Sequence, residues 1–297
     1  MLDGIVWFFV NIARAFVNFG YAVTHPASWL DWSDKENLAR FIYYGASVEF
    51  FFVILTSFLV LTAVGLWRRE VLWGTVRVLE TFANGIGRLI AWAGLIMVLQ
   101  QIMIIFLQRI FRVSSIELAP LGYGFARDLS WWSEELKLYN AAIICLAVSY
   151  TFIQGGHVRV DLVYSGVRHR TRKVIDMAGA LVFMMPMAVL IWLYAWFFMW
   201  RHLVVPNPSA SATLERTLMQ ARAMRWNVET TSFSPNGFDA YFLFKVLMVI
   251  FAGMVFLQAI AVFYRSYLGF VEGEDADTRH LDKDTLGEGD DAFDGAH

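Results

Sequence analysis

Long apolar stretches dominate the pattern of hydrophobic and polar positions along this chain. A helix needs about 20 predominantly apolar residues to cross the hydrocarbon core of a bilayer. Five stretches meet this length, and none shows the alternation with period two that barrel strands require. Each therefore predicts a transmembrane helix, which satisfies its own backbone hydrogen bonds in lipid. The predicted spans are Phe41–Trp67, Ile86–Gln108, Leu136–Ile153, Val174–Trp200 and Tyr241–Tyr264.

A sixth segment, Gly4–Val23, has two interpretations. It is long enough to span, but Asn11, Arg14 and Asn18 recur at steps of three and four residues and share one helical face. The segment can lie in the membrane interface as an amphipathic helix. It can also span, with the polar face turned toward protein. The sequence leaves both interpretations open.

Composition places the chain among membrane proteins. Of its 297 residues, 58% are apolar and 17% are charged, whereas soluble domains have about 45–50% and 25%. We therefore predict an all-α, polytopic helical membrane protein embedded in a lipid bilayer. The single cysteine, Cys145, excludes a disulfide scaffold and a thiolate metal cluster. The net charge of −2 argues against nucleic acid as a partner.

Basic residues predict the orientation of the spans. The segment Gly155–Lys173 holds five Arg and Lys residues and one acid, so we expect it to be cytoplasmic. Alternation of the spans then places residues 112–131 and 202–239 on the outer side and the C-terminus in the cytoplasm. Residues 272–297 hold ten acidic and two basic residues, a composition typical of a solvated, disordered tail.

The chain lacks the patterns of common catalytic and cofactor sites. None of its six histidines lies inside the five predicted spans, which disfavours a transmembrane haem. A glycine-rich phosphate loop, a nucleophile elbow and a zinc-binding His-Glu-x-x-His are also missing. We therefore expect no enzymatic activity and no cofactor in this chain. A membrane anchor subunit of a respiratory or redox complex remains the alternative function.

The spans also lack the features of a self-sufficient transporter. No Asp or Glu lies near the middle of a span, and no internal repeat is visible. The intramembrane polar residues are amides, among them Gln100 and Gln101, which typically bond to neighbouring helices. Trp192, Trp196 and Trp200 recur every four residues, and we interpret this stripe as an interfacial aromatic anchor.

Charged residues gather at both ends of the span Leu136–Ile153. Glu134 and Glu135 precede it, and His157, Arg159 and Asp161 follow it. Acidic groups at a membrane boundary cost free energy unless they are paired. The cluster is either an ion-pair network that fixes the helix ends or a docking surface for another membrane subunit. These two interpretations are compatible.

These residues carry a resemblance to a known family. The run Ser-Glu-Glu-Leu at 133–136, an apolar helix, and Gly-His-Val-Arg-Val-Asp at 156–161 resemble the signature of DctQ-type small membrane subunits of tripartite ATP-independent periplasmic (TRAP) transporters. The likeness covers roughly Gly85–Phe270. It implies a four-helix membrane domain over 84–270. Before it comes an N-terminal extension over 1–83, with the segment 4–23 and a span at 41–67. The acidic tail over 271–297 follows.

The resemblance also implies a division of labour in the bacterial inner membrane. A separate large subunit would bind sodium and substrate and move as an elevator, while this chain would be a static scaffold. A periplasmic solute-binding protein would deliver a carboxylate or sulfonate. The motif assigns structural or interface roles to Glu135, His157, Arg159 and Asp161. In the outer loop 202–239, three arginines are candidate contacts for the binding protein: Arg216, Arg222 and Arg225.

Overall fold

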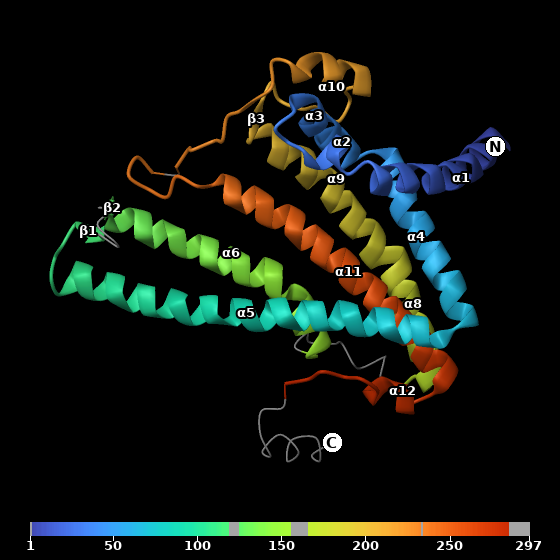
Figure 1. The fold of residues 1–297 in the computed structure, drawn as a ribbon. Helices are drawn as coiled ribbons and strands as arrows, with labels where there is room; N and C mark the ends of the chain where they lie inside the picture. The colour runs from blue at the N-terminus through green and yellow to red at the C-terminus, as the bar shows by residue number, and fades with distance from the viewer. Residues whose placement is uncertain (1, 119–124, 156–165, 233, 285–297) are drawn as a thin grey trace.

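The computed structural model describes residues 2–118, 125–155, 166–232 and 234–284, which are mostly helical (Figure 1). Within these residues, six helices are long and apolar enough to cross a membrane, which confirms the predicted all-α polytopic class. The six are α1 (Leu2–Thr24), α4 (Val48–Trp67), α5 (Arg69–Arg109), α6 (Leu129–Ile153), the continuous helix formed by α8 (His169–Gly179), η2 (Ala180–Met184) and α9 (Met185–Arg201), and α11 (Phe242–Glu272).

Shorter elements connect these helices and define two ends of the molecule. Strands β1 and β2 pair antiparallel, with Ser115 opposite Asp128, and β3 pairs with β4. Figure 1 shows β1 and β2 at the tips of α5 and α6 and β3 beside α10, and we call the side of the molecule that carries these two regions the hairpin end. The opposite side, with residues 272–284, is the C-terminal end. The short elements are α2 (Ala27–Leu30), α3 (Lys35–Tyr44), β1 (Ser115–Leu118), β2 (Phe125–Asp128), β3 (Val204–Val205), α10 (Leu214–Ala221), β4 (Arg225–Trp226) and α12 (Asp275–Thr278).

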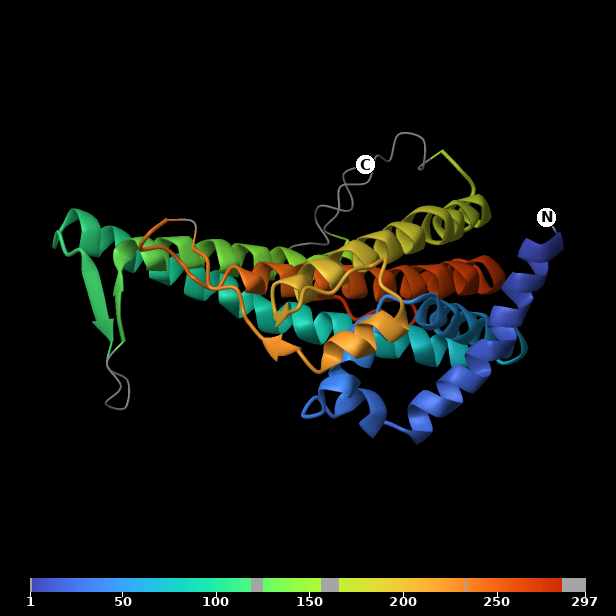
Figure 2. The same cartoon turned by 90° about the horizontal axis from the view of Figure 1, so that it is seen from above.

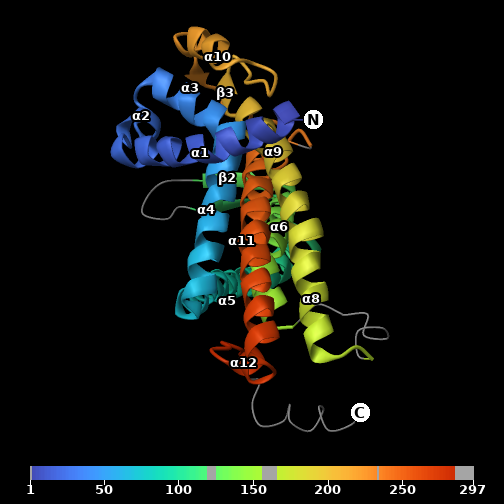
Figure 3. The same cartoon turned by 90° about the vertical axis from the view of Figure 1, so that its right-hand side faces the viewer.

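Helix α11 lies at the centre of the bundle. It packs against α5, α6, α8 and α9, and Figure 3 shows it between α4 and α8. Ala252, Ala259 and Ala261 of α11 are buried, and such small side chains let neighbouring helices approach closely. Most of the polar contacts described below join α11, or the segments on either side of it, to another helix.

Helix α5 runs along α6 and is far longer than a bilayer requires. Its 41 residues extend about 60 Å at the helical rise of 1.5 Å per residue. The predicted span Ile86–Gln108 is the second part of this helix, where many apolar side chains are exposed. Figure 2 shows the β1–β2 hairpin projecting from the ends of α5 and α6.

The predicted span Phe41–Trp67 is interrupted in the structure. Helix α3 ends at Tyr44 and α4 begins at Val48. The hydroxyl of Ser47 accepts a hydrogen bond from the backbone N–H of Phe50 at 3.2 Å and caps the new helix. The apolar helix therefore covers Val48–Trp67, and α3 belongs to the hairpin end.

The predicted span Val174–Trp200 contains a π-helical turn at Ala180–Met184. Pro186 lies two residues after the end of this turn. Proline lacks an N–H, and its ring clashes with the carbonyl four residues earlier in a regular helix. The wider turn before Pro186 accommodates this clash, so that α8 and α9 continue as one long helix.

Helix α1 crosses α4 instead of running along it (Figures 1 and 3). The rings of Trp7 and Phe8 contact that of Phe52, with centroids 5.3 and 5.6 Å apart, and Ala15 is buried. If α4 spans the membrane, a helix that crosses it in this way lies more along the membrane plane than across it. This arrangement bears on the two interpretations of Gly4–Val23 and favours the interfacial one.

Buried aromatic side chains hold the hairpin end together. Trp196 and Trp200 pack with Leu38, Ile42 and other residues of α3, α9 and the α10 region. The indole of Trp196 donates to the backbone oxygen of Ile42 at 2.8 Å. The tryptophan stripe that we interpreted as an interfacial anchor thus packs against protein, because α3 folds back over this part of α9.

Candidate subunit-interface site

Glu134 joins α6 to the segment that precedes α11. Its carboxylate accepts hydrogen bonds from the hydroxyl of Ser234 and the backbone N–H of Phe238, both at 2.9 Å. A Cβ at Gly237 would overlap this carboxylate, so the close approach requires glycine. Neutral donors therefore satisfy this boundary acid, whereas an ion-pair network was one of the two interpretations that the sequence left open.

A second contact joins the same two segments. The indole of Trp131 donates to Asp239 at 3.0 Å, and Arg127 forms an ion pair with this carboxylate at 3.4 Å. The hydrogen bond from Trp131 lowers the pKa of Asp239 from its ordinary value, against the opposite effect of burial, and the charge of Arg127 adds to the lowering. Asp239 is therefore ionised at neutral pH and ties the start of α11 to α6.

Glu135 faces α5. Its carboxylate accepts a hydrogen bond at 3.1 Å from the amide of Gln100, which also donates to the backbone oxygen of Trp132 at 3.3 Å. The structure thus brings two predicted interface residues together, in a contact within this chain. Gln101, the next residue on α5, is exposed.

The motif residues His157, Arg159 and Asp161 lie outside the described residues. The described chain reaches Gly155, just after α6, where the backbone φ of +77° is one that favours glycine. The roles that we expect for the three motif residues therefore stay predictions.

The three arginines that we predicted as contacts for the binding protein lie in residues 202–239, at the hairpin end. Arg216, Arg222 and Arg225 are exposed on α10, just after it, and on β4. The backbone oxygen of Arg222 accepts a hydrogen bond from Lys35 at 3.3 Å, which connects this region to α3. The three arginines are exposed, and none of them takes part in the contacts of Glu134 and Glu135 described above.

A set of charged contacts at the C-terminal end was not predicted from the sequence. Arg265 of α11 pairs with the buried Glu80 of α5, with Nε 2.6 Å from the carboxylate. Asp277 pairs with Lys173 at 2.7 Å and with His169 at 3.0 Å. Burial acts to raise the pKa of Asp277, but the hydrogen bonds from Lys173 and His169 outweigh it and lower this pKa. Arg265 directly follows a predicted span, which could have signalled the need for a partner.

We expected the segment 271–297 to be a disordered acidic tail, but its described part holds a short helix and contacts other helices. Residues 275–278 form α12, and the indole of Trp73 lies 3.3 Å from the carboxylate of Glu272. Farther along, Asp282 and Asp284 contact α5 and α6. These acidic side chains contact cationic and amide side chains at the ends of the helices. Composition alone does not reveal such contacts. Residues 285–297 lie outside the described part.

The fold and these contacts define a multi-pass helical membrane protein whose polar side chains mainly tie its helices together. A family model described as "Tripartite ATP-independent periplasmic transporters, DctQ component" matches residues 121–269. The chain therefore belongs to this family, and the resemblance drawn from its motif is confirmed. The matched range holds α6, α8, α9 and most of α11, whereas α1–α5 precede it. Neither a curated protein nor a solved structure matches the chain.

Proposed function

We propose that this chain is the scaffold subunit of a sodium-driven importer of organic acids in the bacterial inner membrane. A large membrane subunit would bind sodium and a carboxylate or sulfonate, and this chain would brace it. A periplasmic binding protein would deliver the solute at the hairpin end, with the exposed Arg216, Arg222 and Arg225 as candidate contacts. Membership of the DctQ component family is the observation that supports this proposal most strongly.

The internal contacts are those expected of a rigid brace. Glu134 and Asp239 hold α11 to α6 at the hairpin end. Arg265 holds α11 to Glu80 of α5 near the opposite end. A helix fixed at both ends by charged and hydrogen-bonded side chains resists sliding against its neighbours. Such a bundle suits a subunit that stays still while its partner moves.

Helix α5 offers a face for the large subunit. Gln101 is exposed in the apolar part of α5, and Val98 and Ile105, three residues before it and four after it, are also exposed on this face. An amide that faces lipid without a hydrogen-bond partner costs free energy. We therefore propose that this face of α5 packs against the large subunit, which would supply the partner for Gln101.

Co-purification tests this proposal. The tagged chain, expressed with its large subunit and extracted in mild detergent, should retain the large subunit, and Gln101→Leu should retain less of it. Ile96→Ala is the matched control, because Ile96 is exposed on another face of the same helix. A wild-type chain that purifies alone would contradict the scaffold function, whereas equal retention by Gln101→Leu would contradict only the assigned face.

A further inference from the structure

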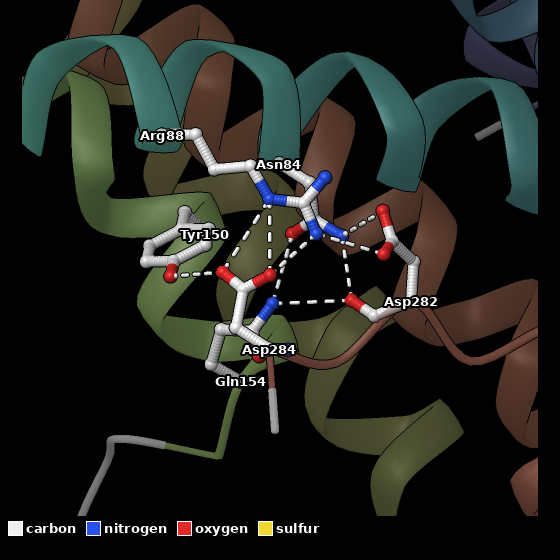
Figure 4. A network of polar contacts seen from close by, with 6 residues as sticks. All are labelled: Asn84, Arg88, Tyr150, Gln154, Asp282 and Asp284. Atoms are coloured by element: carbon white, nitrogen blue, oxygen red, sulfur yellow. Dashed lines mark hydrogen bonds and ion pairs between the residues drawn. The ribbon is translucent and has the colours of Figure 1, made fainter. Parts of the chain in front are cut away.

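A polar site lies where α5 and α6 meet near the C-terminal end (Figure 4). Asn84 and Arg88 come from α5, Tyr150 comes from the last turn of α6, and Gln154 directly follows α6. Asn84 is wholly buried, with 0% of its surface exposed. A Cβ at Gly87 would overlap Tyr150, so this glycine lets the two helices approach closely beside the site.

The site binds the backbone of the C-terminal segment. The backbone oxygen of Asp282 accepts hydrogen bonds from the amides of Asn84 at 2.8 Å and Gln154 at 3.1 Å. The backbone N–H of Asp284 donates to the side-chain oxygen of Gln154 at 2.9 Å. These contacts to backbone atoms determine which residues of the segment occupy the site. Attraction between charges alone would let the segment shift along the site.

The site also binds both carboxylates. Nη2 of Arg88 lies 2.8 Å from Asp282 and 2.6 Å from Asp284, and its Nε donates to Asp284 at 3.1 Å. The hydroxyl of Tyr150 donates to the other oxygen of Asp284 at 2.6 Å. One guanidinium thus donates charge-assisted hydrogen bonds to two carboxylates, and such bonds are stronger than those between neutral groups.

We propose that Asn84, Arg88, Tyr150 and Gln154 form a carboxylate-binding site whose ligand is the chain's own acidic segment, residues 282–284. Residues 273–284 form a strap that runs from the end of α11 across α5 to α6, and its last three residues occupy the site. It holds the last turn of α6, two residues before the family motif begins at Gly156. Occupancy of the site therefore fixes the helix end from which the motif segment departs.

Limited proteolysis of the full chain in detergent tests this strap. Trypsin cleaves after Arg279, just before the bound segment, and the rate follows the fraction of molecules with the segment released. Arg88→Gln should raise the rate of cleavage about tenfold, the factor expected for loss of hydrogen bonds to a charged group. This variant leaves the sequence around the cleaved bond unchanged. Asp282→Asn with Asp284→Asn should have a similar effect and leaves α5 and α6 intact.

Two matched controls separate specific binding from a general effect of charge. Arg69→Gln removes an exposed arginine from the same helix. Asp290→Asn with Asp291→Asn removes two charges from the same acidic tail. Each rate is divided by that of the corresponding free peptide, and both controls should stay within about twofold of wild type. The proposal is overturned if Arg88→Gln and the 282/284 variant also stay in this range, or if the 290/291 variant is cleaved as fast as the 282/284 variant.

Discussion

Both ends of the described bundle combine apolar and polar contacts, but buried tryptophans dominate at the hairpin end, whereas the C-terminal end adds several ion pairs to the cluster around Trp73 and Tyr264. Trp196 and Trp200 are almost fully buried among apolar neighbours of α3 and α9. The C-terminal end depends more on Arg265 with Glu80, Lys173 with Asp277, and Arg88 with two aspartates. The free energy gained by burying apolar surface varies little with ionic strength, but the attraction within exposed ion pairs weakens as salt screens the charges. Added salt should therefore weaken the exposed pairs of Arg88 with Asp282 and Asp284 before it affects the buried tryptophans.

Truncation of a buried tryptophan at the hairpin end should cause the largest loss of stability. Trp196→Ala removes a ring that is 6% exposed and should lower the free energy of unfolding by about 3–5 kcal/mol, as for other buried aromatic residues. Thermal unfolding in detergent measures the loss. Trp92→Ala is the control, because Trp92 is 67% exposed on α5. Equal losses for the two variants would show that the cluster does not stabilise the hairpin end.

The next effect comes from a pair of glycines on α5. Gly87→Ala places a Cβ against Tyr150 and should cost about 1–3 kcal/mol of stability through overpacking. Gly85→Ala meets no atom within 4 Å and should stabilise the helix by up to about 1 kcal/mol, because alanine favours helix. Thermal unfolding of both variants in the same detergent measures whether each substitution raises or lowers the stability. A shift of the same sign in both would contradict the close packing of α5 on α6.

A smaller effect should depend on pH. The pKa of Asp277 is lowered by Lys173 and His169, so its contribution to stability is present above the ordinary carboxyl pKa of about 4 and is lost as pH falls through the lowered value. Asp277→Asn should cost about 1 kcal/mol or less at pH 7, because the side chain is partly exposed. The difference from wild type should vanish in acid. A difference that is constant from pH 7 to about pH 3 would exclude this ionic role.

The smallest effect on stability is expected for the family motif. Because we propose that Asp161 acts at the contact with the large subunit, Asp161→Ala should leave the free energy of unfolding of the isolated chain within about 0.5 kcal/mol of wild type. It should nevertheless reduce co-purification of the large subunit and uptake by the assembled transporter. Asp290→Ala in the acidic tail serves as the control. Unchanged assembly and uptake in Asp161→Ala would remove the interface role that we propose for this residue.

The sequence predicted the membrane helices because their signal is local. A run of about 20 apolar residues identifies a span without knowledge of its neighbours, and the contact between Gln100 and Glu135 joins two residues already singled out as polar at the membrane. The break before Val48 was missed because Gly45, Ala46 and Ser47 interrupt the apolar pattern only briefly. The strap could not be predicted in this way, because Asn84 and Asp282 lie 198 residues apart and only the folded bundle brings them together.

We propose that this chain braces a transporter and does not itself transport. The most direct test reconstitutes the purified chain alone in liposomes with an inward sodium gradient and follows ²²Na⁺ uptake. We predict uptake equal to that of protein-free liposomes, and coupled uptake only when the large subunit and binding protein are added with their solute. Saturable ²²Na⁺ uptake by this chain alone would contradict the proposed scaffold function.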